Sequence, residues 1–145
     1  MIKILCVGKI KEDYLKELIN DYQKRITAYH KLEIIELKDS DIETESKEII
    51  KNINEKDYNI LLDIKGKKYN SIEISKLIDN TFINGYGTIT FIIGASNGVT
   101  EEVKTKCNER LSFSDLTFPH GLFRGMLLEQ IYRSFKILNN ESYHK

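Results

Sequence analysis

Short apolar runs alternate with amphipathic segments along the whole chain, and this alternation limits the fold more than any other feature. Apolar runs that predict buried strands cover residues 2–7, 32–37, 59–64, 88–94 and 110–114. Apolar residues recur at helical spacing in 12–29, 70–84 and 121–138, and shorter helices are expected within 39–55 and at 100–107. Strands that alternate with helices in this way predict an α/β fold with a mainly parallel sheet and helices on both faces.

The length of 145 residues favours one domain that spans residues 1–145, and no linker rich in Pro, Gly or Ser interrupts it. No apolar run approaches the roughly 18 residues that a membrane-spanning helix needs. The apolar stretch at the N-terminus is too short for a secretory signal and is expected to be the first strand. We therefore expect a cytoplasmic protein with no membrane partner.

The charges balance, because Lys plus Arg and Asp plus Glu each number 22. A single chain therefore lacks the excess positive charge of a protein that binds nucleic acid mainly through charge, and we expect no DNA partner. An RNA partner would have to be bound by a local patch, by two chains together, or by shape. Cys6 and Cys107 form no C-x-x-C and the three histidines have no zinc spacing, so we expect no metal site and a reducing compartment.

Parallel α/β sheets bind ligands beyond the carboxyl ends of their strands. This rule directs attention to the loops at 64–70, 94–99 and 114–120, each of which follows a predicted strand. The segment Gly94–Gly98, GASNG, matches neither a Walker A sequence nor G-x-G-x-x-G, and the next helix opens with Glu101-Glu102. Carboxylates at a helix N-terminus repel phosphate, so a neutral, zwitterionic or cationic ligand is expected. The alternative is that Asn97-Gly98 is only a turn.

The segment 113–118, FSDLTF, alternates apolar residues with small polar ones after the last strand. Such a segment can form a wall for a flat apolar ligand such as adenine, with free backbone groups at the edge of the ring. Ordinary packing beneath a connection is the alternative. For Arg124 and Arg133 the alternative to a functional role is a solvated or ion-paired helix face, and for His144 it is a frayed terminus.

Several segments together resemble the RlmH family of SPOUT-class methyltransferases, the bacterial 23S rRNA (pseudouridine-N3)-methyltransferases. The matching segments follow in order along nearly the whole chain: ILCVGKIKEDY at the start, LLDIKGK at 61–67, FIIGASNG at 91–98, LSFSDLTFPH at 111–120, LLEQIYRSFKI at 127–137 and the terminal YHK. The resemblance implies S-adenosylmethionine as methyl donor, a pseudouridine of helix 69 in the assembled ribosome as acceptor, a homodimer, and a C-terminal trefoil knot. Without it, the rule that chains are un-knotted would favour a flavodoxin-like order of strands.

The resemblance also implies roles for individual residues. Arg124 or Arg133 would stabilise charge on the carbonyls of the target base, and His144, or as second choice His120, would accept its proton. The C-terminal tail, residues 139–145, would close over the partner's site, with Tyr143 packing there, because its polar composition gives it no reason to dock on its own helix. The residues implied for cofactor binding are Leu62, Gly94, Phe113, Ser114, Asp115, Leu116, Thr117 and Phe118.

Two departures from the family pattern and two rival functions remain. Ala95 stands where the family often has a second glycine, and the region 39–50 is short. One rival is a nucleotide- or flavin-binding α/β module, which Glu101-Glu102 disfavour. The other is a non-catalytic ribosome-binding factor, which predicts a degraded cofactor pocket. Calorimetric titration with S-adenosylmethionine distinguishes these functions.

Overall fold

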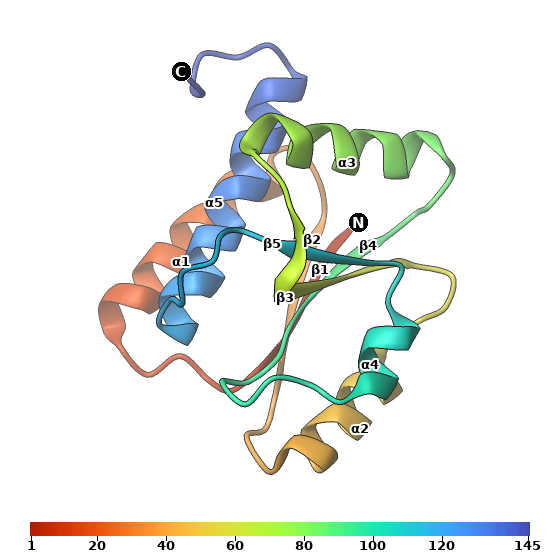
Figure 1. Cartoon of the computed structure of the whole chain (residues 1–145). Coiled ribbons are helices and arrows are strands. Elements are labelled where there is room, and N and C mark those ends of the chain that lie inside the picture. Colours follow the sequence, from red (N-terminus) through yellow and green to blue (C-terminus); the bar gives the residue numbers. More distant parts are fainter.

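The computed structural model describes all residues, 1–145, as a single five-stranded sheet with five helices (Figure 1). All neighbouring strands are parallel and their order is β2-β1-β4-β3-β5. The elements in chain order are β1 (Ile2–Val7), α1 (Asp13–Thr27), β2 (Leu32–Leu37), α2 (Ile42–Asn52), β3 (Tyr58–Lys68), α3 (Ser71–Ile83), β4 (Ile89–Ile93), α4 (Glu101–Lys106), β5 (Glu109–Ser112) and α5 (His120–Leu138). The predicted α/β class, with helices on both faces of a parallel sheet, is confirmed.

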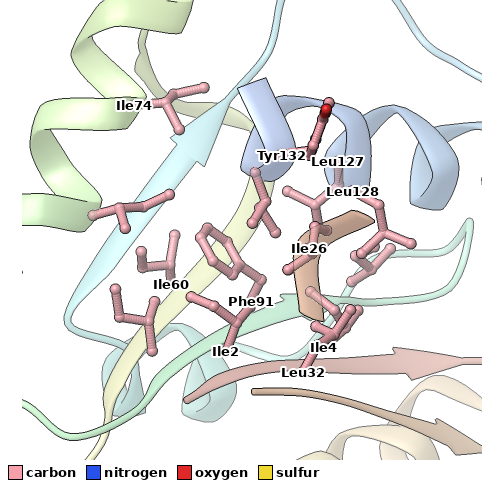
Figure 2. Close-up of a cluster of buried hydrophobic side chains, with 14 of the residues drawn as sticks. Ile2, Ile4, Ile26, Leu32, Ile60, Ile74, Phe91, Leu127, Leu128 and Tyr132 are labelled. Atoms are coloured by element: carbon pink, nitrogen blue, oxygen red, sulfur yellow. The ribbon is translucent and has the colours of Figure 1, made fainter. Parts of the chain in front are cut away.

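The two faces of the sheet carry unequal layers. Helices α1, α3 and α5 cover one face, while α2 and the short α4 lie together on the other (Figure 1). The larger face buries a cluster of 18 residues in which Phe91 lies at the centre, between side chains of the strands and those of α5 (Figure 2). The smaller face buries a cluster of 6 residues. The larger layer therefore supplies most of the apolar burial that stabilises the fold.

Strand β3 is longer than the sequence predicts, and this corrects the expectation of a loop at 64–70. It continues to Lys68 and pairs with β5 a second time, with Lys67 opposite Leu111, after an irregularity that begins at Leu62. At Gly66 the two strands come so close that a Cβ atom would lie 2.7 Å from the carbonyl of Arg110. The stretch with Lys65, Lys67 and Lys68 resembles a loop in sequence, because this end of β3 is largely exposed and an exposed strand segment has no apolar pattern to reveal it.

The ends of the helices largely follow the sequence signals. Asn70 lies three residues before Glu73 in the sequence, which predicts a capping box, and the structure shows this box at the start of α3. The pair Asn84-Gly85 predicts the end of the same helix, and Gly85, with φ of +99°, follows its C-terminus. Thr100 occupies the N-cap position of α4, but its side chain makes no capping bond there. No helix combines the length and apolar character needed to cross a bilayer.

Candidate active site

A cavity of about 400 Å³ lies where β3, β4 and β5 end. Its walls come from the end of β3, from the loop after β4 and from the segment between β5 and α5. The volume falls within the range of small-molecule sites, about 300–1,000 Å³. The structure thus brings the predicted loops at 94–99 and 114–120 together with Leu62, Asp63 and Ile64 of β3. This space is called the cofactor cavity below.

Most of the residues expected to bind the cofactor line this cavity, and one does not. The exception is Asp115, whose exposed carboxylate forms an ion pair with Lys68 at 2.5 Å. The Asp115 side chain is directed to Lys68 on β3 and to solvent, and it does not line the cavity. A role of Asp115 in cofactor binding stays a prediction. The lining residues from the expected set are Leu62, Gly94, Phe113, Ser114, Leu116, Thr117 and Phe118.

Internal contacts hold the segment from Ser112 to Phe118 in place. Ser112 donates a hydrogen bond to the carbonyl of Ser114, and the hydroxyl of Ser114 accepts one from the backbone N–H of Leu116, both at 3.0 Å. The ring of Phe123 on α5 packs against Phe113 and Phe118, with centroids 4.9 and 6.0 Å apart. The apolar wall expected from the FSDLTF segment is therefore built jointly with α5, a contribution that no local pattern in the sequence indicated.

Two charged residues that were not predicted from the sequence, Asp63 and Lys104, also line the cofactor cavity. The carboxylate of Asp63 accepts a hydrogen bond from the backbone of Lys65 at 3.0 Å and lies 3.5 Å from Arg110. Lys104 on α4 forms an ion pair with Glu101 at 3.1 Å. One anion and one cation suit the amino and carboxylate groups of a zwitterion better than they suit a phosphate. The position of Asp63, directly after the buried part of a strand, was the signal that could have identified it.

The loop after β4 is both a turn and a wall of the cavity. The N–H of Gly98 donates to the carbonyl of Ala95 at 2.8 Å, and Gly98 has a φ of +83°. At Gly94, a Cβ atom would lie 2.7 Å from Cγ1 of Val99. Glycine is therefore required at position 94 by the packing of the loop on itself, and the open cavity lies beside it.

Arg124 is buried and lies outside the cofactor cavity. Its guanidinium donates to Glu36 on β2 at 2.6 Å and to the carbonyl of Gly8 at 3.0 Å, and only 1% of the residue is exposed. Its Nε atom has no partner. These bonds attach the first turns of α5 to the ends of β1 and β2, so Arg124 presents no donor to the cavity in this conformation.

The other predicted catalytic residues gather with Glu129 in one group, called the tail cluster below. Arg133 forms an ion pair with Glu129 at 2.9 Å, and the hydroxyl of Tyr143 donates to the same carboxylate at 2.9 Å. The guanidinium also lies 4.7 Å from the ring centre of Tyr143 and 3.0 Å from Nδ1 of His144. The tail therefore docks on its own helix, contrary to expectation, because Tyr143 finds both an aromatic neighbour, Tyr132, and a carboxylate there.

The tail cluster has defined protonation. Burial, together with hydrogen bonds to Tyr22 and Glu129, raises the pKa of Tyr143, so its hydroxyl stays protonated and donates. The ion pair with Glu129 raises the pKa of Arg133. Since arginine only donates, Nδ1 of His144 accepts from it, and a neutral His144 carries its proton on Nε2. His144 therefore has no free nitrogen lone pair in this conformation.

The tail cluster and the cofactor cavity are neighbours without being one site. Glu129 lines a second cavity, which also includes Phe113 and Phe118 from the wall of the cofactor cavity. The rings of these two phenylalanines thus separate the space beside the tail cluster from the cofactor cavity.

The sheet is parallel, and the cofactor cavity lies at the carboxyl ends of β3, β4 and β5, as is typical of α/β proteins that bind a small molecule. The last helix is bonded back to the end of β1. The model described as "Predicted SPOUT methyltransferase" matches residues 1–144. The chain belongs to the SPOUT methyltransferase family, which the sequence resemblance predicted, and this membership implies the C-terminal trefoil knot.

Relatives that match this chain over nearly its whole length carry a more specific name than the family. Proteins named "Ribosomal RNA large subunit methyltransferase H" from Clostridium botulinum, strains Kyoto and 657, are 48% and 49% identical over 157 aligned positions, with 99% of each chain covered. The alignments exceed the 145 residues of this chain, so these relatives carry residues that it lacks. The solved structure titled as a probable methylase family protein from Haemophilus influenzae Rd KW20 has a TM-score of 0.60 at 14% identity and covers 99% of this chain and 70% of its own. That likeness supports the fold alone.

Proposed function

We propose that this protein methylates N3 of a pseudouridine in helix 69 of 23S rRNA, with S-adenosylmethionine as donor and the assembled ribosome as substrate. The observation that carries the proposal is a cavity lined by one carboxylate, that of Asp63, and one ammonium group, that of Lys104. It lies in a SPOUT chain whose full-length relatives are named rRNA large subunit methyltransferases. The protein would act in the cytoplasm as a homodimer.

The lining of the cofactor cavity fits S-adenosylmethionine. The apolar wall of Phe113, Phe118 and Leu62 accepts the adenine ring, and free backbone groups of the surrounding loops bind its edge. Asp63 pairs with the ammonium of the methionine part and Lys104 with its carboxylate. When bound, the cofactor supplies an electrophilic methyl group on a sulfonium, which carries no phosphate for Glu101-Glu102 to repel.

The residues of the protein must then position the acceptor and manage one proton. Methyl transfer needs an in-line approach, so the loops at 94–99 and 112–118, which internal hydrogen bonds hold in place, contribute by orienting the donor. Arg133 lies in the tail cluster, away from the donor of its own chain, so it would stabilise the negative charge on the carbonyls flanking the acceptor nitrogen at the partner's site in the dimer. Arg124 acts indirectly, as a positioning residue that attaches α5 to β1.

We propose that the tail cluster takes part in the reaction only in the dimer. In the single chain, Glu129, Tyr143 and His144 satisfy one another beside the second cavity, away from the donor. Two chains related by a twofold axis exchange such elements readily. We infer that the tail reaches the partner's site in the dimer, where Tyr143 and His144 position the target base.

Three measurements test this function in sequence. Calorimetric titration should show binding of S-adenosylmethionine, and binding of ATP or flavin mononucleotide instead would favour the nucleotide-binding module. Ribosomes that lack the modification should then accept a labelled methyl group, recovered as N3-methylpseudouridine in helix 69, whereas naked RNA fragments should be poor acceptors. Ribosome binding without methyl transfer would favour the non-catalytic factor. Light scattering that shows a monomer across the micromolar range would contradict the dimer.

A further inference from the structure

A third cavity, of about 430 Å³, adjoins the cofactor cavity on the side away from the tail cluster. It lies between the turn that joins β1 to α1 and the first turn of α5, and it contains residues 7–12 and 119–122. The two cavities share Ala95, Ser96 and His120. A molecule in the third cavity therefore lies directly beside a ligand in the cofactor cavity, as an acceptor must.

The lining of this third cavity suits a nucleotide of an RNA strand. Lys9 and Lys11 are exposed and take part in no ion pair, so both ammonium groups are free to bind phosphate. The ring of Tyr14, at the start of α1, is 69% exposed and offers a face on which a base can stack. Glu12 and Asp39 also line the cavity and balance the two lysines, which fits a neutral base inside and its phosphate at the exposed rim.

His120 stands where the two cavities meet, and its hydrogen bond determines which nitrogen is free. Its Nε2 lies 2.8 Å from the carbonyl oxygen of Val7. A carbonyl can only accept, so Nε2 carries the proton, and in the neutral ring Nδ1 keeps a free lone pair. The hydrogen bond therefore orients the ring from one side and leaves a proton acceptor on the other.

His144, the residue that the resemblance favours as base, lacks this property in the same structure. Its Nδ1 is engaged by Arg133, and the tail cluster adjoins the cofactor cavity only across Phe113 and Phe118. His120 needs no partner chain and no rearrangement to face both cavities.

We infer that the third cavity binds the acceptor nucleotide, a uridine-type base with its flanking phosphate, and that His120 receives the proton of the base. The inference rests on the proposed function. In the methyl-transfer step, the N–H proton of the base passes to Nδ1 of His120, and the nitrogen electron pair forms the new N–C bond. The C–S bond of the donor breaks, its electrons remain on sulfur as a neutral thioether, and the imidazolium then releases its proton to water.

The variant His120→Gln tests the proton acceptor, because the amide of glutamine still donates to Val7 but accepts no proton at neutral pH. We expect kcat on ribosomes to fall on the order of 10²–10⁴-fold while the cofactor Kd and the thermal midpoint stay unchanged. In the wild type kcat should depend on pH through this proton acceptor, and that dependence should be absent in His120→Gln. The titratable groups that face His120 across the two cavities, and that must stay intact in this comparison, are Asp63, Lys104, Lys9, Lys11, Glu12, Tyr14 and Asp39.

Two outcomes would overturn the role of His120. A glutamine variant with the activity and pH profile of wild type would leave His120 with a purely structural role. A variant His144→Gln that loses the pH dependence of kcat, while His120→Gln keeps it, would return the role to the tail. Nitrogen NMR of the His120 ring gives a readout independent of activity, because it should show Nε2–H in the neutral state.

The double variant Lys9→Gln/Lys11→Gln tests the cavity without touching the chemistry. Its KM for ribosomes should rise while kcat at saturation is retained, and the slope of log affinity against log salt should decrease by about 1 for each phosphate that a lysine no longer neutralises. The matched control is Lys16→Gln/Lys24→Gln, which removes the same charge from exposed, unpaired positions of α1 outside the cavity. Equal effects of the two double variants on cosedimentation with ribosomes would contradict a specific site.

These experiments separate the inference from the function on which it rests. If wild-type protein fails to methylate ribosomes, the proposed function fails. If wild type is active and both the glutamine variant and the lysine variant behave like wild type, only the acceptor cavity fails.

Discussion

The cofactor cavity and the tail cluster are built in opposite ways from neighbouring parts of one chain. Loops from three strands converge on the cavity, and charged groups such as Asp63 and Lys104 line an open space. The tail cluster rests on a single helix, and its members bond mainly to one another, Glu129 accepting from both Arg133 and Tyr143. An open site is ready for a ligand, whereas a closed cluster must exchange partners before it can act. Under the proposed function, donor binding would belong to the single chain, and the tail would act only in the assembly.

Removing residues 143–145 should separate the two regions most sharply. Cofactor binding should persist, because none of these residues lines the cofactor cavity. Methyl transfer should fall on the order of 10²–10⁴-fold, since the base is no longer positioned. The free energy of unfolding should fall by only about 1 kcal/mol, because the hydrogen bond from Tyr143 to Glu129 and its ring packing disappear. Calorimetry, a methyl-transfer assay and denaturant unfolding measure the three effects.

A mixed dimer then shows on which chain the tail acts. One chain carries Gly94→Val and the other lacks residues 143–145, and the assay uses a cofactor concentration that fills the intact cavity but leaves the weakened Gly94→Val cavity largely empty. If the tail acts across the interface, the intact cavity of the truncated chain is served by the tail of the Gly94→Val chain, and activity from one of the two sites survives. An inactive mixed dimer would mean that the tail serves its own subunit.

Arg124→Met should destabilise the protein by about 3 kcal/mol, because it leaves Glu36 and the carbonyl of Gly8 without their buried partner. The matched control is Arg25→Met, which breaks an ion pair with Asp21 whose side chains are about half exposed, and it should leave the urea midpoint nearly unchanged. Urea unfolding measures both. Unchanged stability with abolished methyl transfer would make Arg124 a catalytic residue instead of a positioning one.

Gly94→Val should weaken cofactor binding on the order of 30-fold, or about 2 kcal/mol, because its Cβ would lie 2.7 Å from Val99 and the loop must shift. Gly87→Val is the control, since a Cβ there meets nothing within 4 Å. Calorimetric titration compares the two variants, and circular dichroism should show both folded. Cofactor binding by Gly94→Val equal to wild type would show that the loop after β4 does not form the site.

The smallest effect distinguishes two aspartates near the cavity. Asp63→Asn should weaken cofactor binding by about tenfold, because it removes the charge that pairs with the ammonium group. Asp115→Asn should leave binding unchanged, since its side chain is 79% exposed and paired with Lys68 outside the cavity. Titrations at matched ionic strength decide between them. A larger loss of affinity from Asp115→Asn than from Asp63→Asn would reverse the assignment.

Local patterns predicted the elements well and their meeting points only in part. The strand at 2–7, the capping box at Asn70 and the stop at Gly85 depend on neighbouring residues, and the structure confirms them. The extension of β3 to Lys68 was missed, because this end of the strand is largely exposed and shows no apolar alternation. The wall formed by FSDLTF was predicted, but the ring of Phe123 that packs against it comes from α5. The two charged residues of the cavity, Asp63 and Lys104, come from β3 and α4.

The sequence by itself determined the α/β class, the parallel sheet and the loops that could bind a ligand, because apolar periodicity and turn residues act over short stretches of chain. Its resemblance also identified the family. Only the tertiary structure decided that the strand order is β2-β1-β4-β3-β5, that Arg124 is buried against Gly8, and that Tyr143 rests on its own helix. These features depend on contacts between residues far apart in the chain. Local composition cannot encode such contacts, since the same arginine or tyrosine is equally compatible with a solvated face.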